Sequence, residues 1–209
     1  MLVFLGFNRP HSPHFQRIRA SLLKQSGPTM INWFIAGHRI PDGNWYFNPG
    51  EGGRVLGNLC HWTDLTLCLV GVDHAFPCEI VPACEPASKS DFCVGIKFND
   101  GSLAGITFSA KGYTFEGIHE RLNAHRGDAL VSVTDFNQST IEIMERKLKF
   151  TTLHRDHGHS QNIKNSYLAV RDNDRARAVD ARYNKATARI FLGVKKAIDS
   201  GTTIKVTLD

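Results

Sequence analysis

The sequence predicts an α+β domain in which helices cover one face of a large, mostly antiparallel open β-sheet. Short β-rich runs separated by turn residues fill the middle of the chain, from about residue 73 to 153, and helical periodicity appears before and after them. The 209 residues, 42% of them hydrophobic, can bury a sizeable core. Because no linker-like boundary or internal repeat interrupts the pattern, we expect a single domain over residues 1–209.

The first elements are expected to be a strand, a helix and a second strand. Residues 2–7 are rich in strand-forming side chains, and the apolar residues after them recur at helical spacing until Gly27 and Pro28. Residues 29–36 have the composition of a strand and lead into a loop of glycine, proline and asparagine that contains Trp45.

A helix is predicted over residues 54–70, and Gly71 ends it. The β-rich runs that follow, with a turn signal at Asn99-Asp100-Gly101, predict an antiparallel meander. These runs are residues 78–83, 92–98, 103–109, 118–124, 129–134 and 140–148. Helical spacing returns after His159, and the last helix is expected to stop at Gly201.

Composition narrows the function classes. The net charge of +5 permits anionic ligands, but aspartates interrupt the basic residues of the last two helices and no recognition motif accompanies them, so we expect no nucleic-acid binding. No apolar run is long enough to span a bilayer, so no membrane association is expected. Five cysteines without Cys-x-x-Cys spacing fit a reducing, cytoplasmic compartment.

The segment of residues 51–64 is the most informative, because a glycine-rich turn leads straight into a helix that carries His61 and Asp64. Residues three or four apart on a helix share a face, so the imidazole and the carboxylate could project into a single pocket. Imidazole can accept a hydroxyl proton near neutral pH. We therefore predict a catalytic acid/base role for His61, the alternative being a hydrogen-bonded core histidine.

Gly52-Gly53 followed by His61-x-x-Asp64 resembles the signature of the glucose-fructose oxidoreductase and inositol dehydrogenase (Gfo/Idh/MocA) family. Residues 6–13 resemble the strand-to-helix entry of that family's C-terminal domain, and Gly158-His159 resembles the start of its later substrate-side helix. The resemblance implies a nicotinamide-dependent enzyme acting on sugars or cyclitols. It spans nearly the whole chain, but only one half of such an enzyme.

The resemblance also implies further substrate-side residues. Arg9 would lie near the pocket, where a guanidinium can grip an anionic group, and Trp45 could stack on a sugar ring. His159 would begin the substrate-side helix, and Asp64 would bind substrate or orient its neighbours. Family members commonly carry an aspartate one turn before the histidine, where this chain has Gly57, so the neighbouring Asn58 is the candidate for that orienting or sugar-binding role.

The chain has no Gly-x-Gly-x-x-Gly turn after a strand and no phosphate-binding loop. We expect it to be the substrate-binding and oligomerising half of an enzyme whose NAD or NADP is held by an N-terminal dinucleotide-binding (Rossmann) domain, with no cofactor bound to this chain alone. The substrate would be a sugar, nucleotide sugar or cyclitol, and the open sheet would support a homo-oligomer. The alternative is a non-catalytic carbohydrate-binding or oligomerisation scaffold.

A metal site is the other possibility raised by the histidines. His154, His157 and His159 lie close to Asp156, and imidazole and carboxylate groups suit zinc. Their spacing matches no standard zinc motif, so we expect no metal here.

Overall fold

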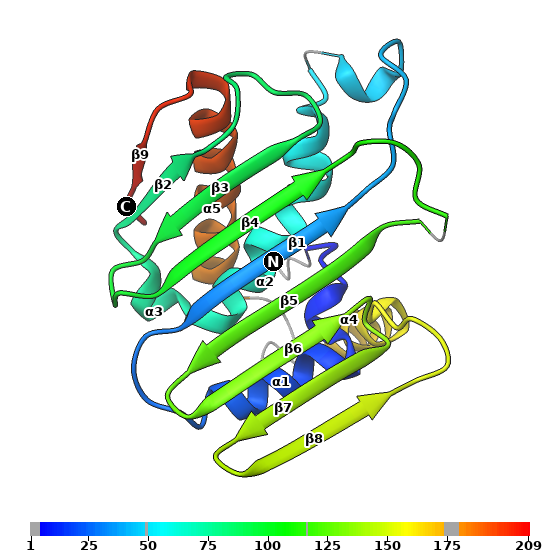
Figure 1. The fold of residues 1–209 in the computed structure, drawn as a ribbon, viewed down its shortest axis with the longest axis vertical. Helices are drawn as coiled ribbons and strands as arrows, with labels where there is room; N and C mark the ends of the chain where they lie inside the picture. The colour runs from blue at the N-terminus through cyan, green and yellow to red at the C-terminus, as the bar shows by residue number, and fades with distance from the viewer. Residues whose placement is uncertain (1–4, 49, 116, 174–179) are drawn as a thin grey trace.

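The computed structural model describes residues 5–48, 50–115, 117–173 and 180–209. Its strands form a nine-stranded sheet in the order β8-β7-β6-β5-β1-β4-β3-β2-β9 (Figure 1). Neighbouring strands run antiparallel except β1 and β4, which are parallel. The predicted α+β class with a mostly antiparallel open sheet is confirmed.

The strands are β1 (Met30–Ala36), β2 (Cys78–Pro82), β3 (Phe92–Lys97), β4 (Leu103–Ser109), β5 (His119–Arg126), β6 (Ala129–Thr134), β7 (Gln138–Ile143), β8 (Arg146–Thr151) and β9 (Ile204–Val206). The helices are α1 (Pro13–Leu22), α2 (Cys60–Val70), α3 (Val72–Ala75), α4 (His159–Arg171) and α5 (Ala181–Ser200). Two 3-10 turns, η1 (Arg9–His11) and η2 (Trp45–Phe47), and a π-helical turn, η3 (Val55–Leu59), complete the elements.

Three expectations about elements need correction. The run 140–148 is not one strand, because Met144 adopts a positive φ of 52° and turns the chain between β7 and β8. Residues 5–7 are not in a strand, since they lie beside α2 rather than beside a strand that could pair with them; residues 1–4 of that prediction lie outside the described part. The predicted helix over 54–70 begins as a π-helical turn and only becomes α-helical at Cys60.

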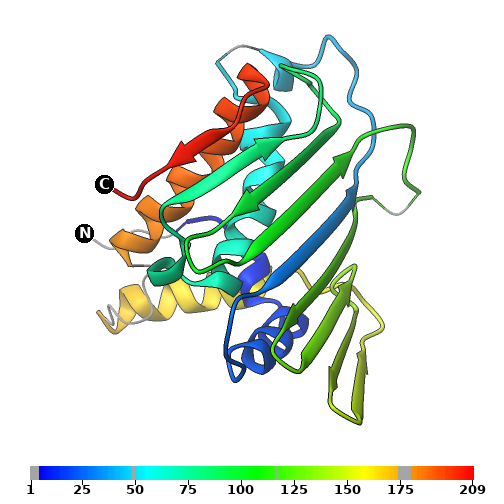
Figure 2. The ribbon, with the colours of Figure 1, turned by 60° about the vertical axis from the view of Figure 1, so that its left-hand side comes forward.

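The core lies between one face of the sheet and the helices (Figure 2). Helix α1 packs on β6 and β7, and α5 packs on β2 and β9. Helix α2 covers the centre of the sheet, where the Trp62 ring lies 5.7 Å from the Phe108 ring and Trp33 Nε1 donates to Thr66 Oγ1 at 3.1 Å. Burial of these large aromatic side chains supplies much of the apolar area that stabilises the fold.

Among the described residues, no helix lies on the opposite face of the sheet (Figure 2). Side chains alternate along each strand, so β1 buries Trp33 and Ile35 while Met30 and Phe34 stay exposed on the other face. No helix in the described ranges is long and apolar enough to cross a membrane.

Candidate functional site

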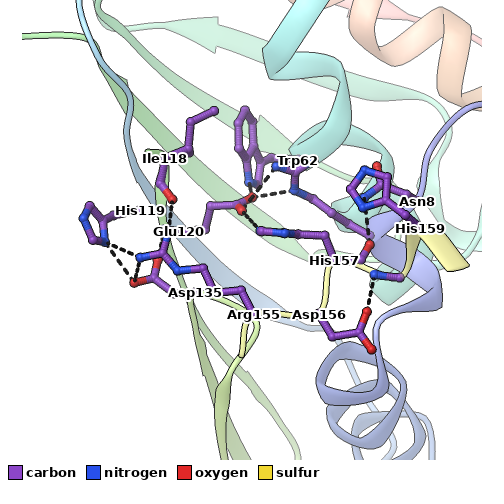
Figure 3. A network of polar contacts seen from close by, with 12 residues as sticks. Asn8, Trp62, Ile118, His119, Glu120, Asp135, Arg155, Asp156, His157 and His159 are labelled. Carbon is purple, nitrogen blue, oxygen red and sulfur yellow. Dashed lines mark hydrogen bonds and ion pairs between the residues drawn. The ribbon is translucent and has the colours of Figure 1, made fainter. Parts of the chain in front are cut away.

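Glu120 on β5 is the centre of a buried polar network that joins the sheet to α2 and to two loops (Figure 3). Its Oε1 accepts from Arg9 Nε at 2.5 Å and from Trp62 Nε1 at 2.8 Å. Its Oε2 accepts from Arg9 Nη2 at 3.2 Å and lies 2.9 Å from His157 Nε2. Both oxygens of the carboxylate therefore have hydrogen-bond partners.

The network keeps Glu120 ionised. Burial acts to raise its pKa, but the hydrogen bond from His157 and the charge and hydrogen bonds of Arg9 outweigh burial and hold the pKa below its ordinary value. The Arg9 guanidinium also lies over the Trp62 ring, 5.2 Å from its centroid. Arg9 is thus fixed in position by a buried ion pair and an aromatic face, rather than free at the surface.

A second ion-pair cluster lies beside the first, where β5 begins and β6 ends. Asp135 accepts from Arg155 Nη2 at 3.3 Å, from the backbone N–H of Glu120 at 2.7 Å, and lies 2.9 Å from His119 Nδ1. The Arg155 guanidinium also donates to the Ile118 carbonyl oxygen (Figure 3). This cluster ties the segment before α4 to β5 and so positions His157.

His61 lies one position before Trp62 at the start of α2, half-buried between aromatic rings. Its ring meets Phe7 edge-to-face at 5.4 Å and Trp62 at 6.3 Å. Burial lowers the pKa of His61 to about 4, helped by the positive charge of Arg9 and opposed by Glu120. The imidazole is therefore neutral at physiological pH.

The two ring nitrogens of His61 differ in access. Nδ1 is buried and has no hydrogen-bond partner among the described residues. We therefore take Nε2 as the candidate nitrogen for contact with a ligand. The ring nitrogens of a histidine that is buried for structural reasons are normally hydrogen-bonded to protein groups or to water. A buried Nδ1 without a partner, beside an arginine–glutamate pair, therefore marks His61 as a candidate reactive group.

One turn before His61, the Tyr46 phenol lies over Gly57. A Cβ atom added at Gly57 would stand 2.0 Å from Tyr46 Oη, so the tyrosine takes the space of a side chain at that position. Tyr46 Oη donates to Asn58 Oδ1 at 2.9 Å, and Arg54 Nη1 lies 3.4 Å from the same oxygen. With its oxygen engaged twice, Asn58 has its Nδ2 donors left for a ligand.

No protein-family model and no curated protein matches this chain, but solved structures do. A Thermotoga maritima protein described as a candidate oxidoreductase superposes with a TM-score of 0.79 at 10% identity, over 98% of this chain and 63% of that one. UDP-N-acetylglucosamine 3-dehydrogenase GnnA from Acidithiobacillus ferrooxidans superposes with a TM-score of 0.73 at 18% identity, over 96% of this chain and 62% of that one. A Sinorhizobium meliloti protein described as a candidate myo-inositol dehydrogenase superposes with a TM-score of 0.67 at 18% identity, over 98% of this chain and 65% of that one.

This chain has the fold of the C-terminal part of these oxidoreductases. It spans less than two thirds of the length of the solved chains that it matches. The predicted resemblance is confirmed at the level of the fold.

Within this oxidoreductase fold, Asp64 does not face the same space as His61. Its Oδ1 accepts from Tyr183 Oη at 2.8 Å and from Thr187 Oγ1 at 3.1 Å, both on α5. The cavity that Asp64 lines does not include His61 among its lining residues. The expectation that the two side chains share a pocket is therefore not met, because the carboxylate turns toward α5.

Trp45 and His159 lie at the surface of the oxidoreductase fold. Trp45 is 61% exposed in η2, and its ring lies edge-to-face with the Tyr46 ring at 5.3 Å. His159 begins α4, exposed, with its Nδ1 3.4 Å from Asn8 Nδ2 and its ring 6.2 Å from that of His157. The structure thus brings His159 close to the Arg9 loop and leaves Trp45 on a separate loop.

The histidine segment before α4 is engaged in other contacts. His157 bonds Glu120, and Asp156 Oδ1 accepts from the backbone N–H of Gly158 at 2.8 Å. No group of three or more His, Cys, Asp or Glu side chains within the described ranges is arranged to hold a metal ion.

Sequence reasoning missed Glu120, His157 as its partner, and Tyr46. A signal for Glu120 was present: it has the same strand parity as Leu122 and Ala124, which point into the core, so a carboxylate at that position had to be paired. Nothing in the sequence indicates its partners, since Arg9 and His157 are 111 and 37 residues away.

Proposed function

We propose that this chain is the substrate-binding half of an NAD(P)-dependent oxidoreductase that acts on a hydroxyl of a sugar, nucleotide sugar or cyclitol. The supporting observation is the neutral, unpartnered imidazole of His61 beside the Arg9–Glu120–His157 network, carried on the fold shared with sugar and cyclitol dehydrogenases.

In this proposal, His61 Nε2 accepts the proton of the substrate hydroxyl while the carbon bearing that hydroxyl gives up hydride. Nicotinamide, when bound, is the hydride acceptor. Arg9 and the exposed His159 offer donors to an anionic group of the substrate, and the Nδ2 atom of Asn58, held in place by Tyr46 and Arg54, offers a donor to a sugar hydroxyl. Trp45 would have to close over the ligand to stack on it.

The described residues do not fit a dinucleotide. The nucleotide-binding glycine motif is absent from the sequence. The turn at Gly52-Gly53 leads into the π-helical turn η3, and the Leu56 side chain and the Tyr46 carbonyl oxygen lie beside these glycines, so they form no open phosphate cradle. We therefore assign NAD or NADP to a separate dinucleotide-binding domain that completes the enzyme. The free cysteines fit a cytoplasmic site of action.

We further propose that the open sheet face joins copies of this chain. That face holds a hollow of about 550 Å³ over the central strands, lined by Met30, Val81, Leu103 and Leu130. Exposed apolar side chains gathered on one sheet face are typical of association surfaces.

A scaffold that has lost redox chemistry is the second candidate. The observation that favours it is Gly57: Tyr46 fills the position one turn before His61, so no carboxylate there can assist the imidazole. A protein of this kind would bind carbohydrate through the same site without turning it over.

The two candidates are separated by reconstitution. The chain is combined with a cognate dinucleotide-binding domain, and reduction of NAD or NADP is followed with a panel of sugars, nucleotide sugars and cyclitols. The dehydrogenase proposal expects substrate-dependent cofactor reduction. Carbohydrate binding by calorimetry without any reduction would favour the scaffold.

A further inference from the structure

His157 has one ring nitrogen bound inside the protein and one open to solvent. Its Nε2 lies 2.9 Å from Oε2 of Glu120, whose side chain is only 1% exposed. An ionised carboxylate can only accept hydrogen bonds, so Nε2 carries the proton and donates to it. In the neutral ring, Nδ1 is then the nitrogen that has the free lone pair.

The Nδ1 atom of His157 can be reached by a ligand. The side chain is 24% exposed. Nδ1 has no hydrogen-bond partner among the described residues, and it is not one of the buried polar atoms left without a partner, so it is open to solvent. A buried carboxylate behind an accessible imidazole nitrogen is the arrangement by which proteins orient a histidine toward a ligand.

The open nitrogen borders the candidate site around His61 (Figure 3). Glu120 also accepts from Trp62 Nε1, and Trp62 directly follows His61. The His159 ring lies 6.2 Å from the His157 ring. Burial is the main cause of the low pKa of His61, and charge on His157 contributes to it, so these two rings lie within electrostatic range of each other.

A purely structural role would be to tie the loop before α4 to the sheet, but other bonds already do so. Arg155 donates to the Ile118 carbonyl oxygen and to Asp135. Asn8 Nδ2 donates to the His157 carbonyl oxygen at 2.7 Å. The backbone on both sides of the ring is therefore held without the imidazole.

A ligand group that meets Nδ1 has to be a hydrogen-bond donor. The charge of Glu120 is matched by that of Arg9, so the network has no excess of negative charge that would attract a cation. A neutral hydroxyl fits this environment. Sugars and cyclitols carry several hydroxyls besides the one that is oxidised.

We propose that His157 binds substrate directly, its Nδ1 accepting a hydrogen bond from a hydroxyl other than the one assigned to His61. Glu120 is the positioning residue, because it fixes the tautomer that leaves Nδ1 without a proton. This inference rests on the proposed function for the class of ligand. It gives His157 a role in substrate specificity rather than in hydride transfer.

His157→Gln separates ligand binding from structure. The glutamine amide can donate to Glu120 in place of Nε2, but it leaves no acceptor at the Nδ1 position. Calorimetry with the folded chain uses myo-inositol and UDP-N-acetylglucosamine as probes. Affinity should fall about fivefold or more, since one hydrogen bond is lost, while the urea midpoint stays close to that of the wild type. His154→Gln, at an exposed position, is the control and should bind as the wild type does.

The tautomer is measured by long-range ¹H–¹⁵N spectra near pH 8.5, where free imidazole is neutral. Wild-type His157 should show a bare Nδ1 whose signal moves saturably as probe is added. In Glu120→Gln the amide oxygen must face Arg9 Nε and Trp62 Nε1, so its NH2 group faces His157 Nε2 and the ring proton moves to Nδ1. That variant should bind probe as weakly as His157→Gln.

Binding by His157→Gln equal to that of the wild type, a protonated Nδ1 in the wild-type chain, or no saturable change at Nδ1 with either probe would each overturn the proposal. Should His157→Gln fail to fold, the wild-type spectra decide. A reconstituted enzyme that reduces no cofactor while Nδ1 still responds to probe would end the dehydrogenase proposal and leave this one standing. Turnover with a KM unchanged by His157→Gln would do the reverse.

Discussion

His61 owes its acid–base behaviour to neighbours that the sequence places far apart. Phe7 and Trp62 remove water from the ring, and Arg9 adds positive charge, so the ring is held neutral. The position of His61 after the glycine turn could be predicted from local pattern. The depth of its burial could not, because it depends on the N-terminal segment returning to cover α2.

The lowered pKa of His61 predicts how stability depends on pH. The folded chain binds fewer protons at this site than the unfolded chain between pH 6.5 and about 4. The stabilisation is thus complete above pH 6.5 and is lost as the pH falls toward 4. His61→Asn should abolish up to about 3 kcal/mol of this acid-induced loss in the free energy of unfolding.

Urea unfolding of the wild type and His61→Asn on both sides of this pH window measures the difference. His154→Asn, an exposed histidine, is the control and should follow the wild type. An identical pH slope for the wild type and His61→Asn would contradict the burial of this ring.

Gly57 and Tyr46 predict a coupled pair of substitutions. Gly57→Ala should push the Tyr46 phenol aside, break its bond to Asn58 and cost about 1–2 kcal/mol of stability. In a Tyr46→Ala background the same change should cost little. A double-mutant cycle by chemical denaturation measures the coupling, and additive effects would show that the two positions do not touch.

At the scale of elements, Gly158 joins α4 to the loop that carries Arg9. It has a positive φ of 80°, and a Cβ there would stand 2.5 Å from the Asn8 carbonyl oxygen and 2.6 Å from the backbone of His11 and Ser12. Backbone atoms cannot give way as a flexible side chain can. The glycine before His159, noted in the sequence only through the family resemblance, is required by this close approach.

Gly158→Ala should therefore cost about 3 kcal/mol or more, as the sum of the left-handed penalty and a backbone clash. Gly112→Ala is the matched control, since its φ of 75° is similar but nothing lies within 4 Å of the added Cβ. The control should cost only about 1–2 kcal/mol. Equal melting temperatures for the two variants would contradict the tight contact between α4 and the Arg9 loop.

Some elements could be predicted from sequence patterns and others could not. The alternation of buried and exposed residues predicted most strands, because that pattern is set locally by the pleat. The turn at Met144, the π-helical turn before α2 and the pairing of β9 with β2 were not predicted. Each of these depends on contacts with distant segments rather than on local composition.

At the scale of the whole molecule, the helices cover one sheet face and leave the other available for association. Leu103→Lys, at the start of β4 on the exposed face, should shift the protein toward monomer without changing its melting temperature by more than about 3 °C. Sedimentation equilibrium measures the change. Leu153→Lys, at an 88% exposed position beyond β8, is the control, and a wild-type chain that is already monomeric would rule out the sheet-face interface.

The central claim is that His61 serves as the proton acceptor of a dehydrogenase completed by a separate dinucleotide domain. The most direct measurement is substrate-dependent NADH formation by the reconstituted enzyme with wild-type chain, His61→Ala and His154→Ala. Loss of one general base predicts a fall in kcat of about 100-fold or more for His61→Ala, with His154→Ala unchanged. Turnover by His61→Ala equal to that of the wild type would contradict the account.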